Sequence, residues 1–278
     1  MKLNLSAIVL ASAVILTAIP LFAADATFER NLTVPGRPDL SISTGAGTIH
    51  LSAGPAGQVH IVGHIHSSWG GSEDRVRELA ARPPVEQTGS IVRIGAHMSG
   101  LNNISIDYEI QAPPDSYLQA SAGSGQINID GVGTNARLNT GSGSIHATGL
   151  RGRVTLSTGS GSINADFGGD SDVKAEAGSG SIELRNVKGG LDAHTGSGRV
   201  NVGGMPTSAW QIHTGSGSVD FWSGNSAFTL DAECGSGGIH SDRPLTDSTQ
   251  KRRALTGKTN GGGPTVRIET GSGSIRIH

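Results

Sequence analysis

Hydrophobic and polar residues alternate with a period of two along most of this chain, and a Gly-Ser-Gly-x-Ile/Val motif interrupts the alternation at nearly regular intervals. Seven copies, spaced 18, 18, 19, 18, 19 and 20 residues apart, begin at Gly123, Gly141, Gly159, Gly178, Gly196, Gly215 and Gly235. A further copy begins at Gly271, and a variant, Gly-Ala-Gly-Thr-Ile, begins at Gly45. A short regular period is typical of one supersecondary unit stacked on itself, because a single unit cannot bury its apolar face alone.

Two alternating segments flank each copy of the motif. Before the motif, two apolar positions enclose a polar one in every copy; the apolar pairs are Ala136 and Leu138, Val154 and Leu156, Val173 and Ala175, Leu191 and Ala193, Trp210 and Ile212, Leu230 and Ala232, and Val266 and Ile268. After the motif, Ile or Val begins a second alternating segment. Because period-two alternation indicates a half-buried strand, each coil is expected to be a strand, a glycine corner, a second strand and a Gly-rich turn. Glycine is expected at the corners because it reaches positive φ without a Cβ clash.

These coils predict an all-β fold, a parallel β-solenoid (β-helix) of about 18-residue coils over 121–278. Like strands of successive coils are expected to pair in parallel, about 4.8 Å apart. The residue just before each Gly-Ser-Gly is small in every copy and is expected to face inward. Cys234 takes this place in one copy, where Thr is usual, and is interpreted as a buried thiol.

The regions outside the repeats are expected to cover the solenoid and to interrupt it. Residues 24–120 predict a β-rich capping region, with strands near 40–50, 58–66, 90–97 and 104–111. Residues 72–81 (SEDRVRELAA) predict one short helix with Ser72 as its N-cap. Residues 241–263 are polar and are expected to form a loop insertion, with a degenerate coil around 254–257, before a terminal strand pair.

The N-terminus and the composition predict an exported protein. Residues 1–23 resemble a secretory signal peptide, with Lys2 ahead of an apolar run that Pro20 ends. No later stretch is apolar over 18 residues, so no transmembrane segment is expected in the mature chain. Cys234 is the only cysteine, which excludes an intramolecular disulfide. The formal net charge of -2 gives no electrostatic reason to expect nucleic acid. The predicted location is the periplasm, the cell surface or the extracellular space.

One group of histidines is a candidate metal site. His60, His64 and His66 share a face of a predicted strand, and His-x-His spacing can bind zinc or copper. The sequence offers no fourth ligand, and solvent-facing polar residues of an alternating strand explain the pattern equally simply. No metal ligand is therefore assigned.

Two groups of acids are weaker candidates. One predicted turn carries three acids, Asp166, Asp170 and Asp172. They are either weak calcium ligands or simply carboxylates exposed to solvent. Polysaccharide-active β-helix enzymes use a cluster of acids on one face, and the candidate members here are Glu176, Glu183 and Asp220. Outward acids are, however, common on any exposed strand. The β-roll calcium motif is excluded, because core Ile or Val fills its ligand position in every copy. No catalytic or cofactor-binding residue and no cofactor is assigned.

The repeats resemble those of the bacterial putative-adhesin family, exported domains of unknown function that are expected to be β-helical. The residues that carry the resemblance are the TGSGSI segments at 140–145, 158–163 and 270–275, with 28–30 and 110–115 in the N-terminal region. The resemblance covers roughly residues 28–278 and implies a surface or envelope protein.

Together these observations predict an exported, non-enzymatic β-solenoid that acts as an adhesin-like envelope scaffold or binding protein. The partner expected is a cell-surface glycan or an envelope protein, contacted through ladders of polar side chains. A polysaccharide-active β-helix enzyme is the first alternative, and a metal-binding envelope protein is the second.

Overall fold

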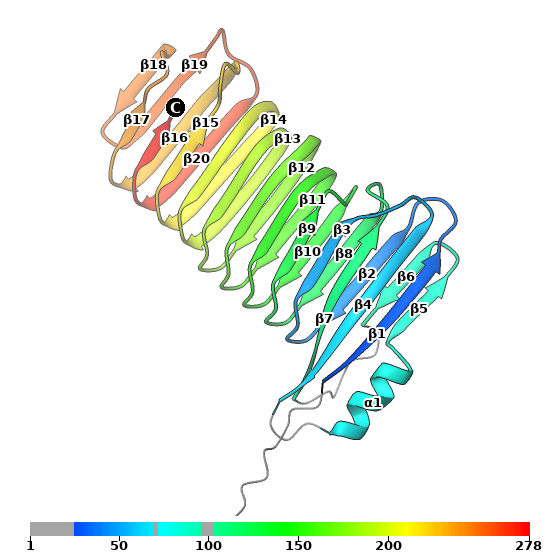
Figure 1. The fold of residues 1–278 in the computed structure, drawn as a ribbon. Helices are drawn as coiled ribbons and strands as arrows, with labels where there is room; N and C mark the ends of the chain where they lie inside the picture. The colour runs from blue at the N-terminus through cyan, green and yellow to red at the C-terminus, as the bar shows by residue number, and fades with distance from the viewer. Residues whose placement is uncertain (1–24, 69–71, 96–102) are drawn as a thin grey trace, which may run out of the picture.

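The structure, a computed structural model, describes residues 25–68, 72–95 and 103–278; the predicted signal peptide at 1–23 lies outside them. Figure 1 shows an elongated stack of strands, with the single helix of the described residues, α1 (Glu73–Ala81), at the N-terminal end of the stack. The all-β solenoid predicted from the repeats is confirmed.

The strands alternate inward and outward residues along almost their whole length. They are β1 (Asp25–Thr33), β2 (Asp39–Thr44), β3 (Ile49–Ala53), β4 (Gln58–Ser67), β5 (Val85–Thr88), β6 (Ile91–Ile94), β7 (Ile104–Ala112), β8 (Tyr117–Ala122), β9 (Ile127–Asp130), β10 (Ala136–Thr140), β11 (Ile145–Thr158), β12 (Ile163–Ala177), β13 (Ile182–Ser197), β14 (Val200–Ser216), β15 (Val219–Trp222), β16 (Phe228–Ser236), β17 (Ile239–Ser241), β18 (Thr246–Lys251), β19 (Ala254–Thr259), β20 (Thr265–Ser272) and β21 (Ile275–Ile277).

Two ladders of paired strands run along the stack. We call the strands that lead into the glycine corners the approach ladder, in the order β5, β6, β2, β8, β10, β11, β12, β13, β14, β20, β16, β19, β18. The strands that leave the corners form the exit ladder, in the order β1, β4, β7, β3, β9, β11, β12, β13, β14, β15, β21, β17. Strands β11 to β14 belong to both ladders, because each bends from one into the other.

The apolar columns predicted from the sequence fill the space between the two ladders. Every member of the two columns before the motif is buried. The largest side chain among them, Trp210, packs against Phe221 with 5.3 Å between ring centroids, and Phe221 packs against Phe228 at the same separation. Each large aliphatic or aromatic side chain buried in this way contributes about 1.5–3 kcal/mol, so stability accumulates coil by coil.

The corner glycines are required for a different reason from the one predicted. None of the motif glycines between Gly123 and Gly217 has a left-handed φ. Instead, each corner lies directly against the corner of the neighbouring coil. A Cβ at Gly161 would lie 1.9 Å from the carbonyl oxygen of Gly143, and a Cβ at Gly143 would lie 1.9 Å from that of Gly125. The expectation of positive φ is therefore wrong for these copies, and close approach of successive backbones explains the glycines.

The small residue before each motif also has a role that its size alone does not indicate. The hydroxyl of Thr140 donates to the carbonyl of Gly125 in the neighbouring coil at 2.9 Å and accepts from the backbone N–H of Gly143 in its own corner at 3.1 Å. The same inter-coil bond is made by Thr158, Thr195, Thr214 and Thr270. Cys234 occupies this column as a buried free thiol, as predicted.

The coils do not stack in sequence order at either end. Residues 39–53, which hold β2 and β3, lie between the coil of β6 and β7 and the coil of β8 and β9. The last coil in the sequence, β20 and β21, lies between β14–β15 and β16–β17. The expected stacking of successive coils from Gly123 to Gly235 is therefore wrong at its last step. Insertion gives the C-terminal strands a hydrogen-bonded neighbour on both sides, so the chain end does not form an open edge.

Antiparallel strands and α1 cover the N-terminal end of the stack. Strand β4 continues the exit ladder antiparallel to β7, and β1 pairs antiparallel with β4; on the approach ladder, β5 pairs antiparallel with β6. Helix α1 buries Val76 and Leu79 and contacts β1 and β4. The predicted helix is confirmed, including its N-cap, because the Ser72 hydroxyl accepts from the backbone N–H of Arg75.

The C-terminal end is covered by a hairpin where the sequence predicted mainly a loop. Strands β18 and β19 pair antiparallel with each other, and β19 pairs antiparallel with β16. This hairpin lies within the stretch 241–263 and satisfies the free edge of β16. Its polar sequence conceals the strands, because β18 is exposed along its whole length and therefore has no apolar face to alternate. The division into 1–23, 24–120 and 121–278 remains a prediction.

Candidate functional site

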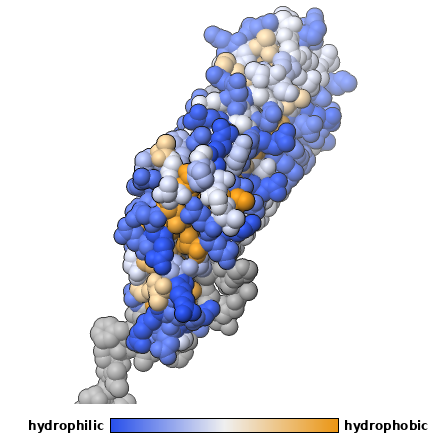
Figure 2. Space-filling view, turned by 90° about the vertical axis from the view of Figure 1, so that its right-hand side faces the viewer, coloured by the Kyte–Doolittle hydropathy of each residue, from blue (hydrophilic) through white to orange (hydrophobic). Residues whose placement is uncertain are grey.

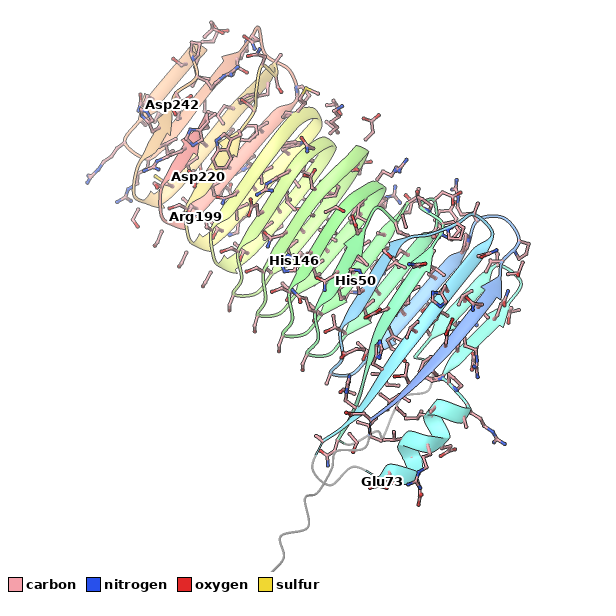
Figure 3. All side chains as sticks on the ribbon, in the orientation of Figure 1. His50, Glu73, His146, Arg199, Asp220 and Asp242 are labelled. Carbon is pink, nitrogen blue, oxygen red and sulfur yellow. The ribbon has the colours of Figure 1, made fainter. Side chains whose placement is uncertain are left out.

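The outer surface of the exit ladder carries a continuous row of polar side chains. We call it the outer row; in stack order it consists of His50, Asn128, His146, Asn164, Glu183, Asn201, Asp220, Arg276 and His240. His50, His146 and Asp220 are labelled along this face in Figure 3. Another long face, seen in Figure 2, is mainly hydrophilic, with hydrophobic residues in a few small groups. The row is built by parallel register, which places equivalent residues of successive coils side by side.

The three predicted histidines lie outward on β4, each beside carboxylates of the flanking strands. His60 Nε2 lies 3.0 Å from Glu29 Oε1, and His64 Nε2 lies 3.7 Å from Glu109 Oε1. His66 lies between Asp25 and Asp107, at 3.3 Å from each. The contacts of His60, His64 and His66 are therefore separate along the strand, each histidine having its own carboxylate partners. Within the described residues, no group of three or more His, Cys, Asp and Glu side chains is arranged to hold a metal ion.

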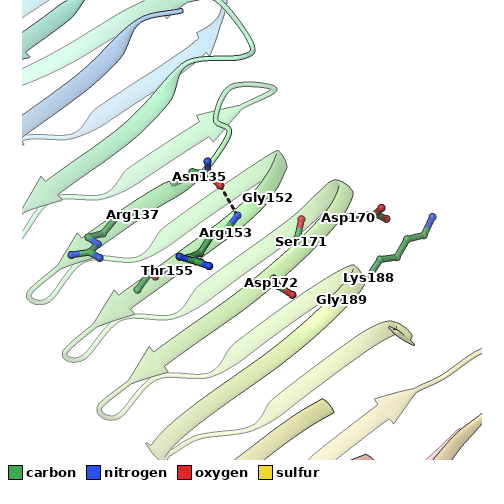
Figure 4. A pocket seen from close by; sticks show the side chains of 11 residues that line it. Asn135, Arg137, Gly152, Arg153, Thr155, Asp170, Ser171, Asp172, Lys188 and Gly189 are labelled. Atoms are coloured by element: carbon green, nitrogen blue, oxygen red, sulfur yellow. Dashed lines mark hydrogen bonds between the residues drawn. The ribbon is translucent and has the colours of Figure 1, made fainter. Parts of the chain in front are cut away.

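The structure separates the acids around the 166–172 turn. Asp166 accepts a hydrogen bond from the side-chain amide of Asn186 at 2.7 Å. Asp170 and Asp172 line a different hollow of about 680 Å³, whose rim also carries Arg153 and Lys188 (Figure 4). Asp172 already accepts from the backbone N–H of Gly190 at 2.9 Å. The hollow lies beside the Gly-rich turns, where the approach ladder begins, and its lining combines acidic and basic side chains. Its carboxylates therefore do not form a purely acidic cluster.

The acids considered for polysaccharide chemistry are likewise not brought together. Glu176 lies on the approach ladder and pairs with Lys174 at 2.8 Å, and this hydrogen bond raises the pKa of Lys174. Glu183 lies on the exit ladder and pairs with Arg185. Asp220 is on the same outer row as Glu183 but is separated from it by Asn201. Each acid is held by its own local partner, so their geometry defines no acid–base pair.

Sequence reasoning missed an aromatic group at the C-terminal end of the outer face. Trp222 is 45% exposed and stacks on His278, with ring centroids 4.9 Å apart and planes inclined by 12°. The His278 ring is held by Asp242 at 3.0 Å and lies 3.6 Å from Asp220. This contact depends on the insertion of β21 beside β15. If the coils are assumed to stack in sequence order, Trp222 and His278 are not neighbours. The exposed Trp222 in an otherwise polar column is the signal that could have marked the place.

The chain belongs to the family described as Toastrack DUF4097, whose sequence model matches residues 84–278. The resemblance to putative adhesins drawn from the repeats is confirmed at the level of this family, whose function is unknown. No curated protein matches the chain. Among the described residues, no helix has the length and apolar character needed to cross a membrane.

Several solved bacterial structures match the chain at low identity. A putative cell adhesion protein from Clostridium sporogenes is 15% identical, with 91% of this chain and 99% of that chain covered and a TM-score of 0.36. A putative adhesin from Bacteroides fragilis is 14% identical, with 91% and 97% covered and a TM-score of 0.49. A putative adhesin from Parabacteroides merdae is 11% identical, with 91% and 96% covered and a TM-score of 0.33.

Proposed function

We propose that this protein is exported and acts without catalysis, as an adhesin-like scaffold whose exit-ladder face binds a component of the cell envelope. The outer row is the observation that carries the proposal. It places Asn, His and charged side chains at successive coil spacings of about 4.8 Å, so that an extended ligand can meet a donor or acceptor on every coil. The signal peptide predicted at 1–23 supports export, and membership of a family that resembles adhesins agrees with an envelope location.

A rigid solenoid suits this role. The row is supported by backbone ladders and by Thr hydroxyls that join successive coils, so its side chains are held in a fixed array before a ligand arrives. Preorganisation of this kind lowers the entropic cost of binding, and many individually weak polar contacts can then add up to useful affinity. The ligand class proposed is a cell-surface glycan or an envelope protein with an extended polar surface.

The proposal is tested with the chain from residue 24 onward, immobilised and exposed to isolated cell-wall fragments. Retention is expected, with loss in a variant of the outer row that carries Asn128→Ala, His146→Ala and Asn164→Ala. A matched variant of the approach ladder, with Arg137→Ala, Thr155→Ala and Ser157→Ala, should retain the fragments. Equal loss in both variants, or no retention by the unmodified protein, would contradict the proposal. Cell fractionation of the full chain tests export separately, because a protein that stays in the cytoplasm is not an envelope adhesin.

A further inference from the structure

We propose that a slot on the exit-ladder face, between Arg185 and Trp222, binds one ring of a neutral saccharide by stacking it on the Trp222 indole. The inference rests on the proposed function, because it assigns a ligand class and a position to the same binding face. The slot belongs to a hollow of about 590 Å³ lined by Glu183, Arg185, Asn186, Asn201, Met205 and Trp222.

The slot exists because one coil carries glycine where its neighbours carry large side chains. Arg185, Gly203 and Trp222 directly follow the inward residues Leu184, Val202 and Phe221 of three adjacent coils, which pair in register. The coils of Arg185 and Trp222 are two spacings apart, roughly 10 Å, and at this position the coil between them has no side chain, because it carries Gly203. This separation admits one flat ring between the two flanking side chains.

The fold itself does not require glycine at position 203. Its φ is not left-handed, and a Cβ there would meet its nearest atom, the Cβ of Trp222, at 3.9 Å, an ordinary van der Waals separation. Its neighbour differs, since a Cβ at Gly204 would lie 2.2 Å from the carbonyl oxygen of Val187. Gly204 is therefore explained by backbone packing, whereas Gly203 is explained by the open space that it leaves beside the indole.

The Trp222 ring is held ready for stacking. His278 covers one side of it in parallel contact at 4.9 Å, and Asp242 fixes His278 at 3.0 Å. The opposite face of the indole borders the hollow, because Trp222 lines the hollow and His278 does not. An exposed indole oriented in this way is a preformed apolar platform, whose electron-rich face attracts the C–H groups of a ligand.

The polar groups around the platform fit hydroxyl groups of a neutral ligand. The side-chain oxygen of Asn201 is buried and has no hydrogen-bond partner among the described residues. A buried acceptor without a partner is unfavourable, and a hydroxyl donor from a ligand would supply the missing partner. Glu183 and Arg185 pair with each other, so the slot has no net charge from these two residues to select an ion. Asn186 and Asn225 add further amides at the rim.

A pyranose ring combines the two features that this slot demands. One face of a gluco-configured ring presents C–H groups, and its rim presents hydroxyls that both donate and accept. An acyl chain would leave the Asn201 oxygen without a donor, and a strongly charged ligand would find no unpaired counter-charge on Glu183 or Arg185. The ligand class assigned is therefore a neutral, gluco-configured saccharide.

The experiment is a titration of the protein from residue 24 onward with cellotetraose and chitotetraose, followed by tryptophan fluorescence and calorimetry. Of the two tryptophans in the described residues, Trp210 is buried and Trp222 is exposed, so a sugar stacked on Trp222 should shift the emission. Binding is expected for at least one of the two sugars, with a tenfold or greater loss in Trp222→Ala and in Gly203→Val. Valine suits an outward strand position, so Gly203→Val should fill the slot while its unfolding midpoint stays that of the unmodified protein. The control Thr155→Val, on the approach ladder, should bind unchanged.

Several results would overturn the inference, and they separate it from the proposed function. If Gly203→Val binds the sugars as well as the unmodified protein, the slot is not the site. If neither sugar binds but cell-wall fragments are still retained, the saccharide assignment falls and the proposed function stands. If retention depends on Trp222 but is abolished by protease treatment of the fragments, the partner is a protein. If Trp222→Ala removes a concentration-dependent dimer and no sugar binds, the surface joins two copies of the chain.

Discussion

The hydroxyl of Thr158 donates to the backbone carbonyl of Gly143, 2.8 Å away in the neighbouring coil, and so joins two turns of the solenoid at their tightest point. The same oxygen accepts from the N–H of Gly161 within its own corner at 3.1 Å. A single side chain thus satisfies two backbone groups at a place where the chain bends out of its ladders. This relationship explains why threonine, among small residues, is favoured before the motif.

Replacing Thr158 by valine keeps the shape of the side chain and removes both hydrogen bonds. Because the carbonyl of Gly143 and the N–H of Gly161 lose their partner, the free energy of unfolding is expected to fall by about 1–3 kcal/mol. Urea denaturation measures this change. Thr158→Ser, which keeps the hydroxyl, should lose less than half as much, and equal losses in the two variants would show that packing of the methyl group, not the hydrogen bonds, is what matters.

The stacking of glycine corners predicts a sharp difference between two Gly→Ala substitutions. A Cβ at Gly161 would lie 1.9 Å from the carbonyl oxygen of Gly143, whereas a Cβ at Gly238 would meet no atom within 4 Å. Gly161→Ala must therefore push two backbones apart and should destabilise the protein by about 3 kcal/mol or more. Gly238→Ala should leave stability unchanged within about 0.5 kcal/mol. Thermal unfolding of both variants decides the matter, and similar midpoints would refute the packing explanation.

Tyr108 predicts a loss of stability in alkali. Burial raises the pKa of its phenol well above the ordinary value. The folded protein then keeps the phenol neutral at pH values above about 10, where the unfolded chain releases the proton, so the free energy of unfolding falls as the pH rises through this range. At neutral pH, both states are protonated and the group contributes no pH dependence.

The variant Tyr108→Phe isolates this contribution. The Tyr108 hydroxyl is buried without a hydrogen-bond partner among the described residues, so its removal should change stability at pH 7 by less than about 1 kcal/mol. Between pH 9 and pH 11, the variant should lose less stability than the unmodified protein when both are followed by urea denaturation. An unchanged alkaline slope would mean that Tyr108 ionises freely in the folded state.

The repeat pattern predicts the ladders and their core because it records burial directly. Leu138 and Ile145, like most of their equivalents in other coils, face inward, and the polar residues beside them face outward, so alternation alone identifies the strands. The sequence predicts the helix equally well, because Ser72 and the acids that follow it form a local capping signal. These features depend on neighbours in the sequence.

The order of the coils could not be read in the same way. All copies of the motif present nearly the same edge, so the sequence around Gly215 gives no local sign that its neighbour is Gly271 and not Gly235. The choice depends on how all the coils pack together, which is a property of the finished stack. The sequence does not predict the Trp222–His278 contact for the same reason.

The functional account depends on this order, and engineered disulfides test it most directly. In a Cys234→Ala background, the pairs Ser216→Cys with Ser272→Cys and Ser236→Cys with Ser272→Cys join residues that pair across adjacent strands. Their Cα atoms are about 4.8 Å apart, within the roughly 4.4–6.8 Å that a disulfide spans, whereas Ser216 and Ser236 are two coils apart. Under mild oxidation, the first two pairs should cross-link and Ser216→Cys with Ser236→Cys should not. Cross-linking of 216 with 236, without cross-linking of 216 with 272, would contradict the inserted coil and, with it, the Trp222 platform.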